Sequence, residues 1–130
     1  MQKMALFVLF LLGILPGFID AETGAKVPIV IGAYPDEDAC GGLGEIRGID
    51  KNGDGFVAVR SGPGTRYKII DKIYSNGTRV HMCSSTGKWE GVVYGKGDCG
   101  TGSPLPAPQA YKGRCKSGWI FHRYVHLIAD

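Results

Sequence analysis

The chain has 130 residues, of which 21% are charged and 44% hydrophobic, and its formal net charge is +3 at pH 7. This length accommodates one domain and leaves no room for a catalytic domain beside it. The 21 glycines and the lack of any amphipathic helical stretch of useful length exclude a helical bundle and favour an all-β fold.

The N-terminus has the pattern of a secretory signal peptide. Lys3 precedes an apolar run at residues 4–15, and the small residue Ala21 follows. The run is shorter than the roughly 20 apolar residues that a membrane-spanning helix needs. We therefore expect residues 1–21 to be removed during export, with Ala25 as the second candidate for the cleavage position.

The basic residues are concentrated in the C-terminal part of the chain. Residues 22–54 contain seven acidic and three basic side chains, whereas the part from residue 56 onward contains eleven basic and four acidic ones. A basic body of this kind fits an acidic partner or surface, and it equally fits ordinary solubilising charge.

Short alternations of apolar and polar residues, separated by turn signals, predict the strands. Residues 22–43 are expected to form an N-terminal arm or loop, in which an alternation at residues 27–31 suits an edge strand or a loose arm. Asn76-Gly77 predicts a hairpin turn, and residues 95–117 predict a long irregular insertion. The predicted strands cover residues 44–49, 56–60, 69–73, 79–83, 88–94 and 118–128.

Four cysteines lie in the part of the chain expected to be exported: Cys40, Cys83, Cys99 and Cys115. An even number of cysteines in an oxidising compartment predicts disulfides rather than a metal site or a catalytic thiol. Four cysteines allow three pairings, and their spacing alone leaves the choice open.

Several motifs, in a characteristic order, resemble the bacterial SH3 (SH3b) family. They are the segment Val57-Ala58-Val59-Arg60-Ser61-Gly62-Pro63-Gly64-Thr65, Gly77, Val80, Trp89, Val92-Val93, Gly118-Trp119-Ile120 and Arg123-Tyr124-Val125. The resemblance implies a small SH3-like barrel over residues 44–130, with a disulfide-bracketed hairpin insertion at residues 95–117 and an N-terminal arm. The whole chain also resembles small exported SH3-domain proteins of proteobacteria that carry such an insertion.

Within this expected fold, the cysteines are predicted to pair as Cys99–Cys115 and Cys40–Cys83. Cys99 and Cys115 bracket the insertion, whose ends a hairpin would bring together. The remaining pair would then tie the N-terminal segment to the barrel.

The aromatic residues are expected to divide between the core and a groove. Trp89 and Trp119 can fill much of a small barrel's core. Tyr67 and Tyr124 are better candidates for a groove, because the polar tip of a tyrosine tolerates partial exposure.

Two arginines complete the predicted ligand-binding set of Arg60, Tyr67, Arg123 and Tyr124. In SH3-like barrels the segments that carry these residues approach each other, so the four side chains are expected to share one face. Guanidinium groups hold carboxylates well. The alternative for Arg60 is that it braces its own loop by bonding backbone carbonyls.

The resemblance implies non-catalytic binding in the periplasm or cell envelope. The expected ligand is a peptidoglycan stem peptide or another anionic envelope polymer. The alternative is a protein–protein role, such as an inhibitor or immunity protein against a secreted toxin or lytic enzyme. No enzymatic activity, cofactor, metal or nucleic acid is expected, and no membrane span is expected after signal cleavage.

Asp50-Lys51-Asn52-Gly53-Asp54-Gly55 matches the first half of an EF-hand calcium loop. Ser61 stands where such a loop needs a bidentate glutamate, and flanking helices are missing. We expect these residues to form a hairpin turn before a strand instead.

Two further motifs that contain cysteine suggest a zinc site and a catalytic thiol, and disulfide formation is the alternative to both. His122 and His126 together with Cys99 and Cys115 could supply four zinc ligands, but the cysteines lack the close spacing of zinc fingers. Cys83 could act as a thiol nucleophile only if it were unpaired. Disulfide formation would remove both functions.

Overall fold

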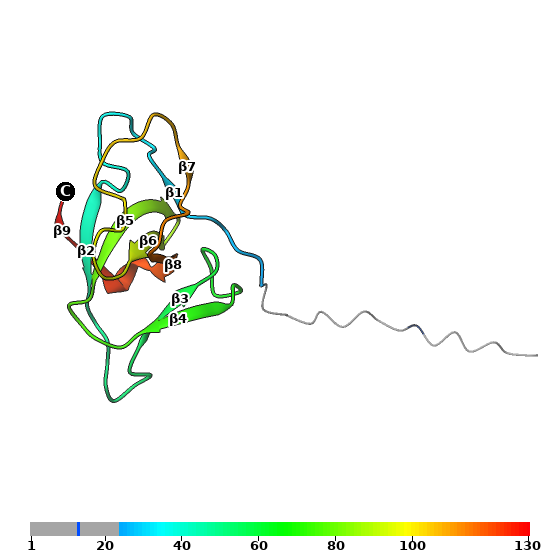
Figure 1. The fold of residues 1–130 in the computed structure, drawn as a ribbon. Helices are drawn as coiled ribbons and strands as arrows, with labels where there is room; N and C mark the ends of the chain where they lie inside the picture. The colour runs from blue at the N-terminus through cyan, green and yellow to red at the C-terminus, as the bar shows by residue number, and fades with distance from the viewer. Residues whose placement is uncertain (1–12, 14–23) are drawn as a thin grey trace, which may run out of the picture.

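The computed structural model describes residue 13 and residues 24–130, so the expected signal peptide at residues 1–21 lies, apart from residue 13, outside the described residues (Figure 1). Over residues 24–130 the fold is all-β, with two sheets and a single 3₁₀ turn, η1, at His122–Tyr124. No helix in the described ranges is long and apolar enough to cross a membrane.

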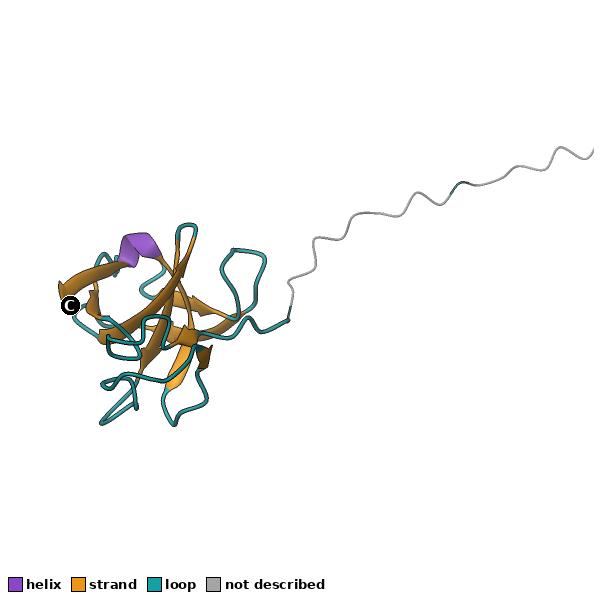
Figure 2. Ribbon diagram, turned by 90° about the horizontal axis from the view of Figure 1, so that it is seen from above, coloured by secondary structure: helices purple, strands orange, loops and turns teal. Residues whose placement is uncertain are grey.

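The larger sheet has seven strands in the order β4-β3-β8-β6-β5-β2-β9, and every neighbouring pair runs antiparallel. These strands are β2 (Gly42–Ile46), β3 (Val57–Arg60), β4 (Ile69–Ile73), β5 (Arg79–Thr86), β6 (Trp89–Tyr94), β8 (Lys116–Phe121) and β9 (Val125–Ala129). The smaller sheet pairs β1 (Val30–Ile31) with β7 (Gln109–Ala110). The strands are strongly bent and the sheet curls around its core (Figure 2).

Alternation along the strands builds the main core. On β3, Val57 and Val59 are buried, while Ala58 and Arg60 lie on the opposite, partly exposed face. Side chains of a strand alternate between faces, so one face of β3 is committed to the interior. The buried residues of this core are Ile46, Ile49, Val57, Val59, Ile73, Val80, Val92, Tyr94, Ile120 and Val125.

The N-terminal segment does not extend away from the domain as a loose arm. Ile29 is 2% exposed and joins a second buried cluster that also contains Ile31 and Trp119. The indole Nε1 of Trp119 donates a hydrogen bond to the Val27 carbonyl over 2.9 Å. Burial of these apolar side chains makes the segment from residue 27 onward part of the core. The core therefore includes residues that precede position 44, where the domain was expected to start.

The insertion replaces the loop of a hairpin formed by β6 and β8. These two strands pair along their full length, from Trp89 opposite Phe121 to Tyr94 opposite Lys116. Lys116 and Ser117, predicted as the end of the insertion, belong to β8. The insertion itself contributes β7, which pairs with β1 and so ties the insertion to the N-terminal segment (Figure 1).

Polar contacts hold the insertion in shape. The Tyr111 hydroxyl donates to the Cys99 carbonyl over 2.7 Å and accepts the Cys115 N–H over 3.1 Å. The guanidinium group of Arg114 donates twice to the Lys96 carbonyl, over 2.6 and 2.7 Å. The insertion is therefore an ordered loop with its own contacts.

The disulfide pairing predicted from the sequence is the one present. Cys99–Cys115 closes the insertion, and Cys40–Cys83 links the segment before β2 to β5 across 43 positions of sequence. All four cysteines are thereby paired. The two bonds fit an oxidising compartment outside the cytoplasm.

The predicted hairpin at Asn76-Gly77 is wrong, because β4 and β5 are not neighbours in the sheet. The Asn76 side chain instead accepts the Ile49 N–H over 3.0 Å and donates to the Ile49 carbonyl over 3.3 Å. The turn thus joins two distant parts of the sheet. A hairpin forms instead at the next turn along the chain, where the two residues Gly87-Lys88 connect the paired strands β5 and β6.

Close packing explains the glycine of the Gly-Trp-Ile motif. A Cβ atom at Gly118 would lie 2.4 Å from Cγ1 of Val59 and 3.1 Å from the Arg60 carbonyl oxygen. Val59 is fully buried and the carbonyl belongs to the backbone of β3, so neither group can easily move to make room for a side chain.

We expect Gly118→Ala to lower the free energy of unfolding by about 1–3 kcal/mol, the usual cost of overpacking a core. Gly102→Ala is the control, because a Cβ there meets nothing within 4 Å. Urea denaturation of both variants measures the difference. Equal stability of the two variants would contradict the close β3–β8 contact.

Candidate functional site: an aromatic groove beside β3

A groove with a volume of about 760 Å³ runs along the outer face of β3. It is formed by β3, the loop between β3 and β4, the ends of β6 and β8, and η1. Its lining residues are Asp54, Phe56, Val57, Ala58, Arg60, Pro63, Gly64, Thr65, Arg66, Tyr67, Ile69, Trp89, Phe121 and Tyr124.

Five of the lining residues are aromatic, and they come from separate parts of the sequence. Trp89 and Phe121 face each other across β6 and β8, with ring centroids 5.6 Å apart in an edge-to-face arrangement. Tyr67 and Tyr124 are half-buried, as a groove requires. Trp119 is in the core as predicted, whereas Trp89 is half-buried and divides its surface between the second core cluster and the groove.

Arg60 braces the loop that it begins. Its Nη1 atom donates to the Thr65 carbonyl over 3.1 Å and to the Tyr67 carbonyl over 2.8 Å. This is the alternative that the sequence left open. Arg60 lines the groove and holds its wall in place, but part of its hydrogen-bonding capacity is already used.

The ring of Tyr67 packs directly on Gly62 of the same loop. A Cβ at Gly62 would lie 2.3 Å from Cδ1 of Tyr67, so only glycine lets the ring occupy this position. The Arg-Ser-Gly-Pro-Gly loop is therefore built to present Tyr67 to the groove.

The structure brings together three of the four predicted ligand-binding residues. Arg60, Tyr67 and Tyr124 line the groove, while Arg123 is exposed and does not. The guanidinium carbon of Arg123 lies 5.9 Å from the ring centroid of Tyr124, which places its charge at the rim.

Arg66 is the lining cation that the sequence did not single out. Its side chain is exposed, and within residues 24–130 no hydrogen bond or ion pair engages it. Phe56 and Phe121 were also missed. The outward register of β3 points to Phe56, but Phe121 joins the groove only through its pairing with Trp89, a contact between strands that no local pattern reveals.

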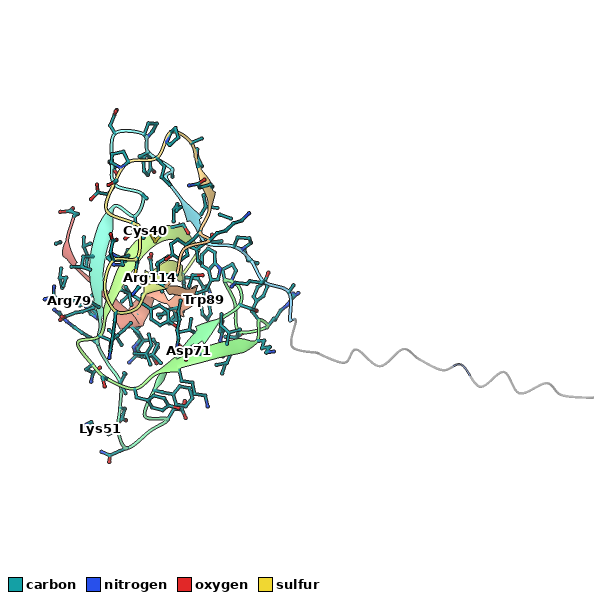
Figure 3. The ribbon with its side chains drawn as sticks, viewed as in Figure 1. Cys40, Lys51, Asp71, Arg79, Trp89 and Arg114 are labelled. Carbon is teal, nitrogen blue, oxygen red and sulfur yellow. A yellow bond between two sulfur atoms is a disulfide. The ribbon has the colours of Figure 1, made fainter. Side chains whose placement is uncertain are left out.

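The EF-hand-like segment is a turn. The Asp50 carboxylate accepts the Asn52 N–H over 2.8 Å, and the Asp50 carbonyl accepts the N–H groups of Gly53 and Gly55. It is not a hairpin turn as predicted, because β2 and β3 are not paired. Lys51 lies at the far tip of this loop (Figure 3). Within the described part of the chain, no three metal-binding side chains converge here or elsewhere.

The possible zinc site and the possible thiol nucleophile both depend on cysteines that form disulfides in the structure. Cys99 and Cys115 bond to each other and so cannot act as thiolate ligands beside His122 and His126. Cys83 is bonded to Cys40, which removes it as a nucleophile.

Comparisons of the chain with protein-family models, curated proteins and solved structures gave no significant match. Function is therefore inferred from the chemistry of the groove.

Proposed function

We propose that the aromatic groove binds a carboxylate-bearing peptide, and that the protein is a non-catalytic binding module of the periplasm or cell envelope. The observation that carries this proposal is the combination of five aromatic side chains with Arg66 in one groove. Aromatic rings pack on the aliphatic parts of a peptide, and a guanidinium fork binds a carboxylate through two hydrogen bonds.

An SH3-like barrel is the fold that we propose for this module. The motifs of the resemblance occupy successive positions that suit it: the Arg-Ser-Gly-Pro-Gly loop follows β3, Trp89 begins β6, and Gly-Trp-Ile lies within β8. Register shifts interrupt the β2–β9, β3–β4 and β5–β6 pairings. Such bulges bend strands, as a small barrel requires.

The proposed ligand is a peptidoglycan stem peptide or another anionic polymer of the envelope. The basic surplus after residue 56 favours an acidic ligand, and two disulfides suit a protein that works outside the cytoplasm. Because exposed charges are screened beyond about 8 Å at physiological ionic strength, binding should weaken as salt rises.

The test measures binding to purified peptidoglycan. We expect Arg66→Ala and Tyr67→Ala each to weaken binding about tenfold or more, since a hydrogen-bonded charge contributes roughly 1.5–3 kcal/mol and an aromatic anchor about 2 kcal/mol or more. Arg123→Ala at the rim should weaken it less.

Arg79→Ala and Tyr34→Ala are the matched controls, because both residues are exposed and lie outside the groove. Each variant must first show a cooperative thermal transition. If the groove variants bind as tightly as the two controls, the groove is not the binding site, and the insertion at residues 95–117 becomes the next candidate.

A further inference from the structure

The strand β4 forms one margin of the large sheet (Figure 1). Within the described residues β3 is the only strand that pairs with it. In an antiparallel ladder about half of an edge strand's N–H and C=O groups point away from its neighbour, so β4 offers a template for another strand. Ile70 adds apolar surface at this margin, with 41% of the residue exposed.

Basic side chains of β4 and of three other segments gather at this margin. Lys68 and Lys72 are exposed immediately before and within the strand. A pocket of about 410 Å³ next to it is lined by Ile70 and Asp71 of β4 and by Lys26, Lys112 and Lys116. These three lysines come from the N-terminal segment, the insertion and the start of β8.

Among the described residues, Asp71 is the one acidic residue that lines this pocket, and its charge is already engaged. Its Oδ2 atom accepts the Tyr94 hydroxyl over 2.6 Å and pairs with Nζ of Lys116 over 3.3 Å. Burial alone would raise the pKa of Asp71, but the hydrogen bonds, that from Tyr94 foremost, outweigh burial and hold it below its usual value. Figure 3 marks Asp71 on this strand.

Lys26 and Lys112 therefore face the pocket without an ion pair to any described residue. Lysines on an edge strand often serve only to prevent aggregation. That role requires charge on the strand itself, which Lys68 and Lys72 already provide. It does not account for two lysines that arrive from the N-terminal segment and from the insertion.

The positive charge of these lysines also favours one kind of binding partner at the edge of β4 over another. A second copy pairing β4 against β4 would bring two sets of lysines together, and like charges across strands are destabilising. An extended segment that carries carboxylates has the complementary charge. We propose that β4 is a docking edge for an acidic, extended segment of a partner protein, which adds as a further strand and places a carboxylate between Lys26 and Lys112. The pocket beside β4 shares no lining residue with the groove, although Ile69 of β4 lines the groove.

The probe for the test is a synthetic peptide, acetyl-Glu-Val-Glu-Val-Glu-Val-Glu-amide. Titrated into the ¹⁵N-labelled protein, it should shift the amide resonances of residues 68–73 and slow their hydrogen exchange. The double variant Lys26→Glu/Lys112→Glu should weaken its binding at least tenfold. The matched control is Lys51→Glu/Lys88→Glu, which changes the net charge equally away from the pocket and should weaken binding much less.

Three outcomes would overturn the proposal. The first is no change at residues 68–73 at millimolar peptide. The second is an equal loss of binding in both double variants, which would show a general charge effect. The third is undiminished binding of both of two N-methylated peptides, one methylated at its glutamates and one at its valines, since strand addition needs the N–H groups of one of these alternating sets. Failure here and failure of the groove proposal are distinguishable, because this test reads the amides of β4 and the lysines of the pocket, whereas the groove test reads peptidoglycan binding by Arg66→Ala and Tyr67→Ala.

Discussion

Removal of the Cys40–Cys83 disulfide by Cys40→Ala/Cys83→Ala is expected to lower the free energy of unfolding by about 4 kcal/mol. The bond joins residues 43 positions apart, and a cross-link restrains the unfolded chain more strongly as the closed loop lengthens. Alanine is the appropriate replacement because Cys40 is buried, where a serine hydroxyl would need a partner. Urea denaturation under non-reducing conditions measures the change.

The variant Cys99→Ala/Cys115→Ala provides the comparison. Its bond joins residues only 16 positions apart, so its loss should cost about 3 kcal/mol. The order of the two variants is the critical result. If loss of Cys40–Cys83 costs clearly less than loss of Cys99–Cys115, then the segment before β2 contributes little to the folded domain.

We expect Ile29→Ala to cost about 2–5 kcal/mol of unfolding free energy, the usual range for emptying a buried aliphatic site. Ile29 is 2% exposed and lies in the cluster that contains Trp119. The adjacent Val30→Ala is the control, because Val30 is 42% exposed and its change should stay within about 0.5 kcal/mol. Similar stability of both variants would mean that the N-terminal segment is not part of the core.

These two predictions concern the same structural feature. The N-terminal segment pairs with β7 of the insertion, receives the indole hydrogen bond of Trp119 and is tied to β5 by a disulfide. It also brings Lys26 to the edge of β4. Its position therefore matters for the proposed docking edge as well as for stability.

Much of the candidate site could be inferred from local sequence. The Arg-Ser-Gly-Pro-Gly loop and Tyr67 lie within eight residues, so their proximity follows from the chain itself. Tyr124 reaches the same groove from η1, the 3₁₀ turn that directly follows β8. Arg123 was expected on the same face as Tyr124, but the turn of η1 directs neighbouring side chains to different sides, and of these two residues Tyr124 lines the groove.

The sequence alone establishes the all-β class, because its short alternations and turn residues suit strands and no stretch suits a helix. It also led to the disulfide pairing, since Cys99 and Cys115 flank one insertion. Which strands are neighbours depends on the packing of the whole fold. Asn76-Gly77 has the local chemistry of a hairpin turn. The Asn76 side chain instead forms a hydrogen bond with Ile49, and the flanking strands β4 and β5 are not neighbours. Strand order depends on burial summed over the whole sheet, and that sum overrides what a turn prefers locally.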